Sequence, residues 1–291
     1  MAPRRLAGGW LDSLGIIASA HVAPRRVDVW LPPGYIYRGT PSAVIYAHDG
    51  QNLFDAHEAY SGVDWGIAPA AALLMRDGII GSVIIVGIWN TPARIGEYLP
   101  RRPLLSATGA ALRASAMLDV GPIRSDAYLR FITGELKPLI DARYRTSADP
   151  AATMLLGSSM GGLIALYGAL EYPGTFGAAA CLSPHWSVAD AWFVDALAEQ
   201  LPDPGRLRIY HDRGTAGIDA GYAAGQQRFD AALLRRGYQP GRDVWSLVAD
   251  GAGHHEAAWR ERVAVPLRAL LGDAHPGRPV RHAPHQIATR Q

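Results

Sequence analysis

The chain of 291 residues contains very little cysteine and very little lysine. Cys181 is the single cysteine, and Lys137 is the single lysine among 28 lysine and arginine residues. One thiol excludes an intramolecular disulfide, so cysteine usage does not restrict the redox compartment. Because Cys181 lies in the apolar segment 178–182, we expect an inert core thiol and not a nucleophile. The scarcity of lysine indicates a compositional bias of the source genome.

Long hydrophobic runs and a strong net charge are also missing. No apolar segment approaches the length of a membrane-spanning helix, and the basic N-terminus lacks the uninterrupted apolar run of a signal peptide. The formal net charge is +2 at pH 7, which favours neither a nucleic-acid partner nor a membrane surface. With 49% hydrophobic and 19% charged residues, the composition is that of a globular protein. We expect a cytoplasmic location.

Short apolar segments alternate with amphipathic ones along most of the chain. The pattern predicts strands at residues 27–31, 43–47, 83–88, 152–156, 177–182, 207–211 and 244–248. It predicts helices near residues 65–77, 125–142, 160–172, 188–200, 219–236 and 256–271. Strands separated by helices indicate an α/β fold, a mostly parallel sheet with helices on both faces.

The domain organisation follows from where this alternation holds. We expect an N-terminal segment at 1–20 and a single domain at 21–273. Residues 99–124 break the alternation and predict an insertion, either a small cap near the site or a plain surface excursion. The segment 274–291 is rich in proline, arginine and histidine, which predicts a disordered tail.

The most informative motif is Gly157-Ser158-Ser159-Met160-Gly161, directly behind the apolar segment 152–156. A buried strand that runs through Gly-x-Ser-x-Gly into a helix is the nucleophile elbow of the α/β-hydrolases. Glycines allow the sharp turn, which leaves the Ser159 hydroxyl exposed for attack. The alternative is a glycine-rich strand-to-helix turn without a reactive serine.

A serine nucleophile needs a base, and the chain order of this fold is serine, acid, histidine. His254 follows the glycine turn after the segment 244–248 and is the expected base, with His255 as the alternative. We expect Glu256 to cap the following helix. A metal site at 254–256 is not expected, because the i, i+4 histidine spacing of a zinc helix is missing.

The acid and the oxyanion donors are expected at other strand ends. Asp212 and Asp219 both follow the predicted strand 207–211, and position alone leaves the choice between them open. The backbone N–H of Met160 follows the nucleophile and is one expected oxyanion donor. The second is the backbone N–H of Gln51, in the loop after segment 43–47.

With these pieces placed, the chain resembles the putative-esterase branch of the α/β-hydrolases over residues 21–271. That branch contains feruloyl esterases, enterochelin-type esterases, S-formylglutathione hydrolases and mycolyltransferases. The resemblance rests on residues 26–35 (RVDVWLPPGY), 46–55 (YAHDGQNLFD), Arg94 with 97–100 (EYLP), 157–162 (GSSMGG), 182–184 (LSP), 212–215 (DRGT) and 253–254 (GH) with Glu256 and Trp259. It implies the α/β-hydrolase fold, favours Asp219 over Asp212 as the acid, and matches His254 as the base.

Several side chains near the motif loops are candidates for the walls of a binding cleft. Aromatic residues suit an aryl or sugar-bearing ester, and tryptophans lie at 65, 89, 186 and 259; core packing is the alternative for each. Asn52, Trp65, His185 and Trp186 are the expected substrate-binding residues. Arg94 and Glu97 are expected to form a structural ion pair.

The sequence therefore predicts a serine-dependent carboxylic-ester hydrolase that acts on a small aryl, acetyl or feruloyl-type ester. The expected catalytic residues are Ser159, Asp219 and His254, and no metal or organic cofactor is required. An acyltransferase with the same three residues is the first alternative. A non-catalytic binding protein on this fold is the second.

Overall fold

A single sheet organises the part of the chain that the structure describes. The computed structural model describes residues 3–35, 39–114 and 121–272. Within them the strand order is β1-β2-β3-β5-β4-β6-β7-β8-β9. The strands are β1 Arg4–Leu6, β2 Gly9–Ile17, β3 Arg25–Leu31, β4 Ala43–His48, β5 Val83–Ile88, β6 Thr153–Ser158, β7 Ala178–Leu182, β8 Arg208–Gly214 and β9 Val244–Ala249. The predicted tail at 274–291 lies outside the described residues.

The sheet is antiparallel at one edge and parallel elsewhere. β1, β2 and β3 pair antiparallel with their neighbours, and β3 pairs antiparallel with β5. From β5 through β4 to β9 every pairing is parallel. The carboxyl ends of these parallel strands therefore meet at one edge of the sheet, where α/β proteins place their sites.

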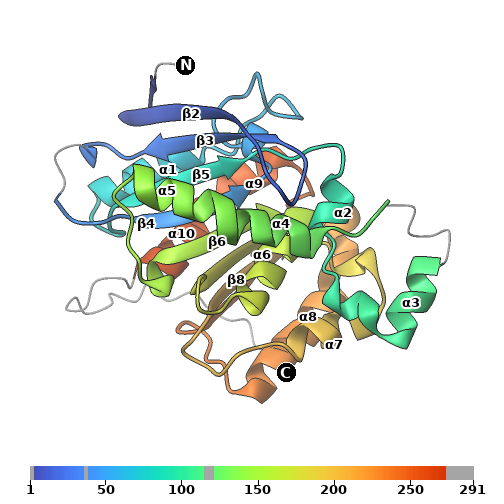
Figure 1. Cartoon of the computed structure of the whole chain (residues 1–291). Coiled ribbons are helices and arrows are strands. Elements are labelled where there is room, and N and C mark those ends of the chain that lie inside the picture. The colour runs from blue at the N-terminus through green and yellow to red at the C-terminus, as the bar shows by residue number, and fades with distance from the viewer. Residues whose placement is uncertain (1–2, 36–38, 115–120, 273–291) are drawn as a thin grey trace.

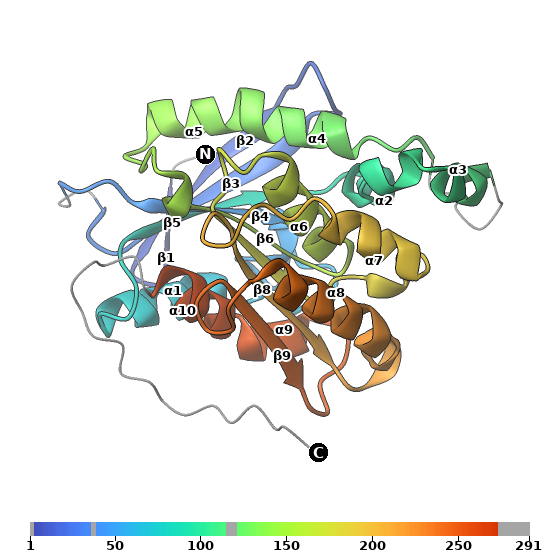
Figure 2. The same ribbon diagram turned by 90° about the horizontal axis from the view of Figure 1, so that it is seen from below.

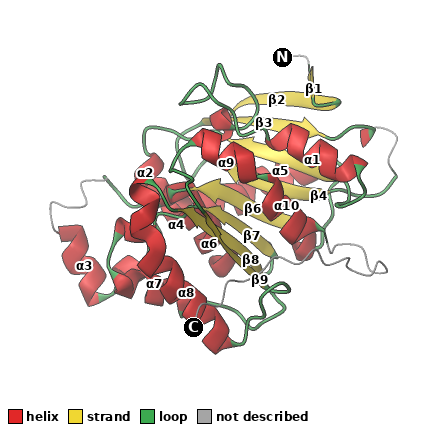
Figure 3. Cartoon of the chain, turned by 180° about the vertical axis from the view of Figure 1, so that it is seen from behind, coloured by secondary structure: helices red, strands yellow, loops and turns green. Residues whose placement is uncertain are grey.

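Helices cover both faces of the sheet, as predicted. They are α1 Ile67–Arg76, α2 Arg94–Tyr98, α3 Ala107–Ala114, α4 Ser125–Phe131, α5 Lys137–Arg143, α6 Met160–Glu171, α7 Ala191–Ala198, α8 Ala223–Arg236, α9 Glu256–Arg262 and α10 Ala264–Leu271. α4 and α5 lie in front of the sheet in Figure 1, and α1, α9 and α10 lie behind it, as Figure 3 shows. Seen from below, the sheet separates these two layers (Figure 2). Each layer encloses its own hydrophobic core.

The central strands are continuous apolar runs because helices cover them on both sides. All residues of β5, β6 and β7 are buried, and Cys181 in β7 is fully buried. β2, in contrast, mixes buried and half-exposed residues. This irregular pattern explains why the sequence pattern predicts no strand at 9–17.

Two of the expected helices differ in detail from the structure. The segment 256–271 is divided at Val263 into α9 and α10. Pro266 explains the division, since a proline has no N–H and its ring would clash with the carbonyl four residues before it. The segment 125–142 continues from α4 to α5 through the π-helical turn Ile132–Leu136.

The segment 99–124 contains the 3₁₀ turn Arg102–Leu105 and helix α3, which projects from the edge of the molecule in Figure 1. Pro103 and Leu104 are buried, and Arg102 binds Glu171 of α6 at 2.6 Å. The base of this segment is therefore fastened to α6.

Within the described residues, no helix combines the length and apolar character needed to cross a membrane.

The predicted ion pair between Arg94 and Glu97 is wrong. Glu97 accepts hydrogen bonds of 2.9 and 2.6 Å from Arg25 of β3, and both side chains are almost fully buried. Arg94 instead binds Asp49. Both residues lie on the short helix α2, but the partner of Glu97 is on β3 and the partner of Arg94 is in the turn after β4, which a local spacing rule does not reveal.

Candidate active site

The predicted site residues gather at the carboxyl ends of the parallel strands. Ser159 follows β6, Asp219 follows β8 and His254 follows β9. The expected oxyanion loop follows β4 as the 3₁₀ turn Gly50–Asn52. Residues that are up to two hundred positions apart in the chain are therefore brought to one edge of the sheet.

Ser159 occupies the sharp turn between β6 and α6. Its backbone angles are φ 55° and ψ −125°, a conformation that costs a non-glycine residue energy and is concentrated at functional sites. The turn is held from both sides, since Ser159 N–H donates to the Leu182 carbonyl at 3.0 Å and His185 N–H donates to the Ser159 carbonyl at 3.2 Å. The side chain is half-buried. This is the geometry that the sequence motif predicts for an elbow.

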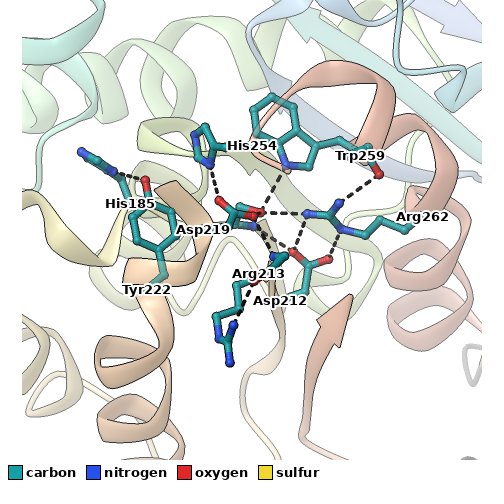
Figure 4. Close-up of polar contacts among 11 residues, drawn as sticks. His185, Asp212, Arg213, Asp219, Tyr222, His254, Trp259 and Arg262 are labelled. Carbon is teal, nitrogen blue, oxygen red and sulfur yellow. Dashed lines mark hydrogen bonds and ion pairs between the residues drawn. The ribbon is translucent and has the colours of Figure 1, made fainter. Parts of the chain in front are cut away.

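Asp219 and His254 are in direct contact. Nδ1 of His254 lies 2.5 Å from Oδ1 of Asp219, whose side chain is completely buried (Figure 4). Burial by itself raises the pKa of Asp219, but hydrogen bonds from His254, Ser183 and Gly214 outweigh it and hold the pKa below its ordinary value. The carboxylate is therefore ionised at neutral pH and can fix the orientation of the imidazole.

The ring of His254 is held in place by aromatic neighbours. It meets Trp259 edge-on at a centroid distance of 5.0 Å and Tyr222 at 5.6 Å. Tyr222 in turn hydrogen-bonds Nδ1 of His185, whose backbone binds the carbonyl of Ser159. A continuous chain of contacts therefore joins the predicted base to the predicted nucleophile.

The two alternative residues have other partners. Asp212 binds Arg262, with Nε of the guanidinium 2.8 Å from Oδ2, and accepts a hydrogen bond from Tyr210 at 2.7 Å. His255 accepts a hydrogen bond from the N–H of Ala258 and so caps the start of α9. The capping hydrogen bond of α9 is therefore made by His255 and not by Glu256, as had been expected. The Glu256 carboxylate does lie in the first turn of the helix.

The two predicted oxyanion donors lie in different elements. Met160 is the first residue of α6, so its N–H has no partner inside the helix and lies at the positive end of the helix dipole. Gln51 lies in the turn after β4, and its side-chain oxygen accepts from Asn90 N–H at 3.3 Å. A Cβ at Gly50 would lie 2.6 Å from the backbone of Gly87, so this turn is pressed against β5.

The turn that carries Gln51 is fixed by a buried charge. Asp49 has φ 56°, and its carboxylate binds Asn90 at 2.6 Å and two nitrogens of Arg94 at 2.7 Å each. Burial raises the pKa of Asp49, but the charge and hydrogen bonds of Arg94 outweigh it and lower that pKa. An ion pair with a residue of helix α2 therefore helps to hold this loop.

Two of the four predicted substrate-binding residues are tryptophans, and both of their rings are buried. Trp65 is completely inaccessible and lies against Trp259 at a ring distance of 5.7 Å. Trp186 is 2% exposed and packs against both His211 and Phe229. The prediction that these two rings line a cleft is therefore wrong, because both belong to the hydrophobic core.

The other two predicted substrate-binding residues differ from each other. Asn52 is 7% exposed, and its side-chain oxygen accepts from Tyr60 N–H, so its visible role is to order the following loop. His185 is half-buried beside the elbow. Burial and the neighbouring charges of His254 and Arg94 lower the pKa of His185, although Asp219 opposes the shift. Because Nδ1 of this neutral imidazole is bonded to Tyr222, its Nε2 is the nitrogen left for a bound molecule.

Three residues at the site were not predicted from the sequence. Ser183 hydrogen-bonds Asp219, Arg262 binds both Ser183 and Asp212, and Tyr222 contacts His254. Ser183 lies at a strand end within the LSP motif, which was a signal for it. Arg262 lies in a helix and carried no signal.

Across residues 3–35, 39–114 and 121–272, no three His, Cys, Asp or Glu side chains gather in a metal-binding arrangement.

Comparisons with known proteins are consistent with this geometry. A family model described as "Putative esterase" matches residues 19–270. The "Uncharacterized protein YbbA" of Bacillus subtilis (strain 168) is 25% identical over 267 residues, which are 89% of this chain and 97% of that protein.

Solved structures share the fold at low sequence identity. An IroE-like serine hydrolase from Shewanella oneidensis has a TM-score of 0.69 and 21% identity, over 91% of this chain and 81% of its own. The enterobactin esterase FES from Shigella flexneri has a TM-score of 0.64 and 18% identity, over 89% of this chain and 59% of its own. These likenesses confirm the α/β-hydrolase fold.

Proposed function

The chain belongs to the putative esterase family, and on that premise we propose that it is a carboxylic-ester hydrolase that works through an acyl-serine intermediate. The observation that carries the proposal is the contact between Asp219 and His254 beside the strained turn of Ser159. A scaffold protein has no need for a buried carboxylate aimed at an imidazole next to such a turn.

In the first half-reaction the Ser159 Oγ attacks the carbonyl carbon of the ester. His254 takes the hydroxyl proton as the Oγ–C bond forms, and Asp219 stabilises the resulting imidazolium. The carbonyl π electrons move onto the oxygen, which becomes an oxyanion. When the tetrahedral intermediate collapses, the C–O bond to the alcohol breaks, and the proton on His254 passes to the leaving alkoxide.

The oxyanion is stabilised by the backbone N–H groups of Met160 and Gln51. Donors that are already fixed before the reaction cost no reorganisation when charge develops, and loss of one such donor slows hydrolysis by roughly 10²–10³-fold. The helix dipole of α6 adds a favourable field at the same position. The ion pair of Asp49 with Arg94 supports this arrangement because it fixes the turn that carries Gln51.

In the second half-reaction water replaces the alcohol. His254 removes a proton from the water, the hydroxyl adds to the acyl carbon, and collapse of the second intermediate breaks the bond to Ser159. Ser159 recovers its proton from His254, and the carboxylic acid leaves. Within this scheme no metal or organic cofactor takes part.

A small aryl, acetyl or feruloyl-type ester is the proposed substrate class. The support is the half-buried imidazole of His185, which lies next to the elbow and is held edge-on against the buried ring of Tyr222. The structural relative from Shigella flexneri was crystallised in the presence of 2,3-dihydroxy-N-benzoyl-glycine, a compound with an aromatic acyl group. That the present chain takes an aromatic ester is part of the proposal.

Hydrolysis of p-nitrophenyl acetate by wild type and by Ser159→Ala tests the reaction. We expect wild-type turnover and a loss of at least 10³-fold in kcat for Ser159→Ala. Ser125→Ala is the matched control, because Ser125 is a completely buried serine at the start of α4. Labelling by a fluorophosphonate, followed by peptide mapping, should place the adduct on Ser159.

The same assay separates hydrolysis from transfer. With methanol added, a hydrolase releases mainly acetic acid at low alcohol concentration, whereas an acyltransferase requires the alcohol for turnover. Turnover by Ser159→Ala at the wild-type rate would contradict the serine mechanism. A folded wild type that neither turns over the ester nor reacts with the fluorophosphonate would contradict the enzyme proposal.

A further inference from the structure

The hydroxyl of Ser183 lies at the centre of a buried network behind the Asp219–His254 pair. Its Oγ is 2.6 Å from Oδ2 of Asp219, the carboxylate oxygen that does not face His254. The same Oγ lies 2.8 Å from Nη2 of Arg262 and 3.3 Å from Nε1 of Trp259. Ser183 is completely buried, so these contacts are shielded from solvent.

The direction of each hydrogen bond in this network follows from donor chemistry. A guanidinium and an indole N–H can only donate, so Arg262 and Trp259 both donate to the Ser183 oxygen. A serine hydroxyl has a single proton, and both of its acceptor positions are then occupied. Its proton must therefore point to the remaining partner, the carboxylate of Asp219. Arg262 and Trp259 thus fix the orientation of the Ser183 hydroxyl toward Asp219.

The backbone of Ser183 is held by the second carboxylate. Ser183 has φ 42°, in the left-handed region that a residue with a Cβ seldom adopts. Its N–H donates to Oδ1 of Asp212 at 2.8 Å, and Asp212 is bound by both Nε and Nη2 of Arg262. Figure 4 shows Asp212 and Arg262 on the side of Asp219 away from His254. Asp212 therefore holds Ser183 in place, and Ser183 in turn binds Asp219, the proposed acid.

We propose that Ser183 is a positioning residue, whose hydroxyl fixes Oδ2 of Asp219 so that Oδ1 stays aimed at Nδ1 of His254. The inference rests on the proposed function, because it assigns the role of the acid to Asp219. Gly214 N–H supplies a second bond to Oδ2 at 2.7 Å. Two donors on one oxygen restrict rotation of the carboxylate about its terminal bond.

The Ser183 hydroxyl also affects how strongly the Asp219 carboxylate interacts with His254. The groups that face this carboxylate are His254 from the loop before α9, Ser183 from the end of β7 and Gly214 N–H from β8, with Tyr222 and His185 further away. The Arg262 charge behind Ser183 is balanced by Asp212. Removal of the hydroxyl takes one hydrogen-bond donor from the Asp219 carboxylate, so more of its negative charge is left to interact with His254.

Two variants that lack the hydroxyl test the proposal together. Ser183→Ala keeps the Cβ, and Ser183→Gly also relieves the strain of the positive φ. With p-nitrophenyl acetate as the probe, we expect both to lose roughly 10- to 100-fold in kcat, the range expected for one hydrogen bond to a charged group. The acid limb of the pH profile of kcat/KM should move toward higher pH. Ser125→Ala is the control that should change neither quantity.

A second readout does not depend on turnover. The proton between His254 and Asp219 should give a downfield ¹H NMR resonance at low pH in wild type, and this resonance should shift or broaden in Ser183→Gly. If Ser183→Ala does not fold, Ser183→Gly carries the test, because glycine accepts this backbone conformation freely. Wild-type kcat, pH profile and resonance in folded Ser183→Gly would overturn the proposal.

The design distinguishes this proposal from the proposed function. Recovery of full activity in Ser183→Gly after a loss in Ser183→Ala would also overturn it, since the backbone and not the hydroxyl would then be what matters. An inactive wild type with no fluorophosphonate adduct contradicts the esterase. The NMR comparison still decides in that case whether Ser183 fixes the pair of Asp219 and His254.

Discussion

Gly157 and Gly161 approach each other so closely across the elbow that no side chain fits between them. A Cβ built on Gly157 would lie 2.4 Å from the carbonyl oxygen of Gly161 and 3.0 Å from its Cα. Real Cβ atoms do not come this close to a backbone oxygen. The first glycine of the motif is therefore required by packing between the end of β6 and the first turn of α6.

Replacement of this glycine should damage both stability and turnover. We expect Gly157→Ala to lower the free energy of unfolding by about 1–3 kcal/mol, as overpacking of a dense interior does, and to displace Ser159. Urea unfolding and p-nitrophenyl acetate turnover measure the two effects. Gly174→Ala is the matched control, because a Cβ there meets nothing within 4 Å. Equal stability of the two variants would contradict the packing argument.

Asp219→Asn should abolish most of the activity without unfolding the protein. An amide cannot stabilise the imidazolium and favours the wrong ring tautomer of His254, so we expect kcat to fall by about 10⁴-fold. Asp212→Asn should act mainly on stability, by about 3 kcal/mol, because it leaves the buried Arg262 without its full partner. Steady-state kinetics and thermal unfolding of both variants test this division. The reverse pattern would make Asp212 the acid.

Arg94→Met should slow the reaction through the oxyanion turn. The substitution leaves Asp49 without its bidentate partner, so the turn that carries Gln51 loosens. Because an oxyanion donor acts only in the transition state, we expect kcat to fall by roughly 10- to 100-fold with little change in KM. Arg76→Met removes an arginine that is 73% exposed and serves as the control. An effect confined to KM would assign Arg94 to substrate binding instead.

His48 should make the protein less stable as the pH falls. The ring is fully buried, and burial lowers its pKa from 6.5 to about 3, although the Asp49 charge opposes the shift. The unfolded chain then binds more protons than the folded protein between these two pH values. The contribution to stability is therefore complete above pH 6.5 and is lost as the pH falls toward 3, at up to about 1.4 kcal/mol per pH unit.

Urea unfolding at pH 7.5, 6 and 5 measures this dependence. His48→Gln removes the titrating ring but keeps a polar side chain for the Tyr128 hydroxyl, which lies 2.8 Å from Nδ1 in the wild type. We expect the variant to lose less stability between pH 7.5 and 5 than the wild type loses. His57→Gln replaces an exposed histidine and should follow the wild type. Parallel curves for wild type and His48→Gln would show that His48 titrates normally.

Much of the scaffold was predictable from short stretches of the chain. The strands at 43–48, 83–88 and 153–158 are apolar runs buried on both faces, and the elbow at Ser159 needs only its neighbouring glycines. Such features depend on the local backbone and on a side-chain pattern that repeats within a few residues. The irregular strand at 9–17 was not predictable, because its pairing with β1 and β3 makes it a strand.

The sequence by itself determined the order of the motifs that follow the parallel strands, the position of Ser159 and the glycines that form its turn. Only the tertiary structure decided that Asp219 meets His254, that Asp212 instead binds Ser183 N–H and Arg262, and that the rings of Trp65 and Trp186 are buried. The physical reason is that these choices depend on contacts between segments far apart in the chain. Their distances and burial are set by how the sheet and its helices pack, which no local pattern encodes.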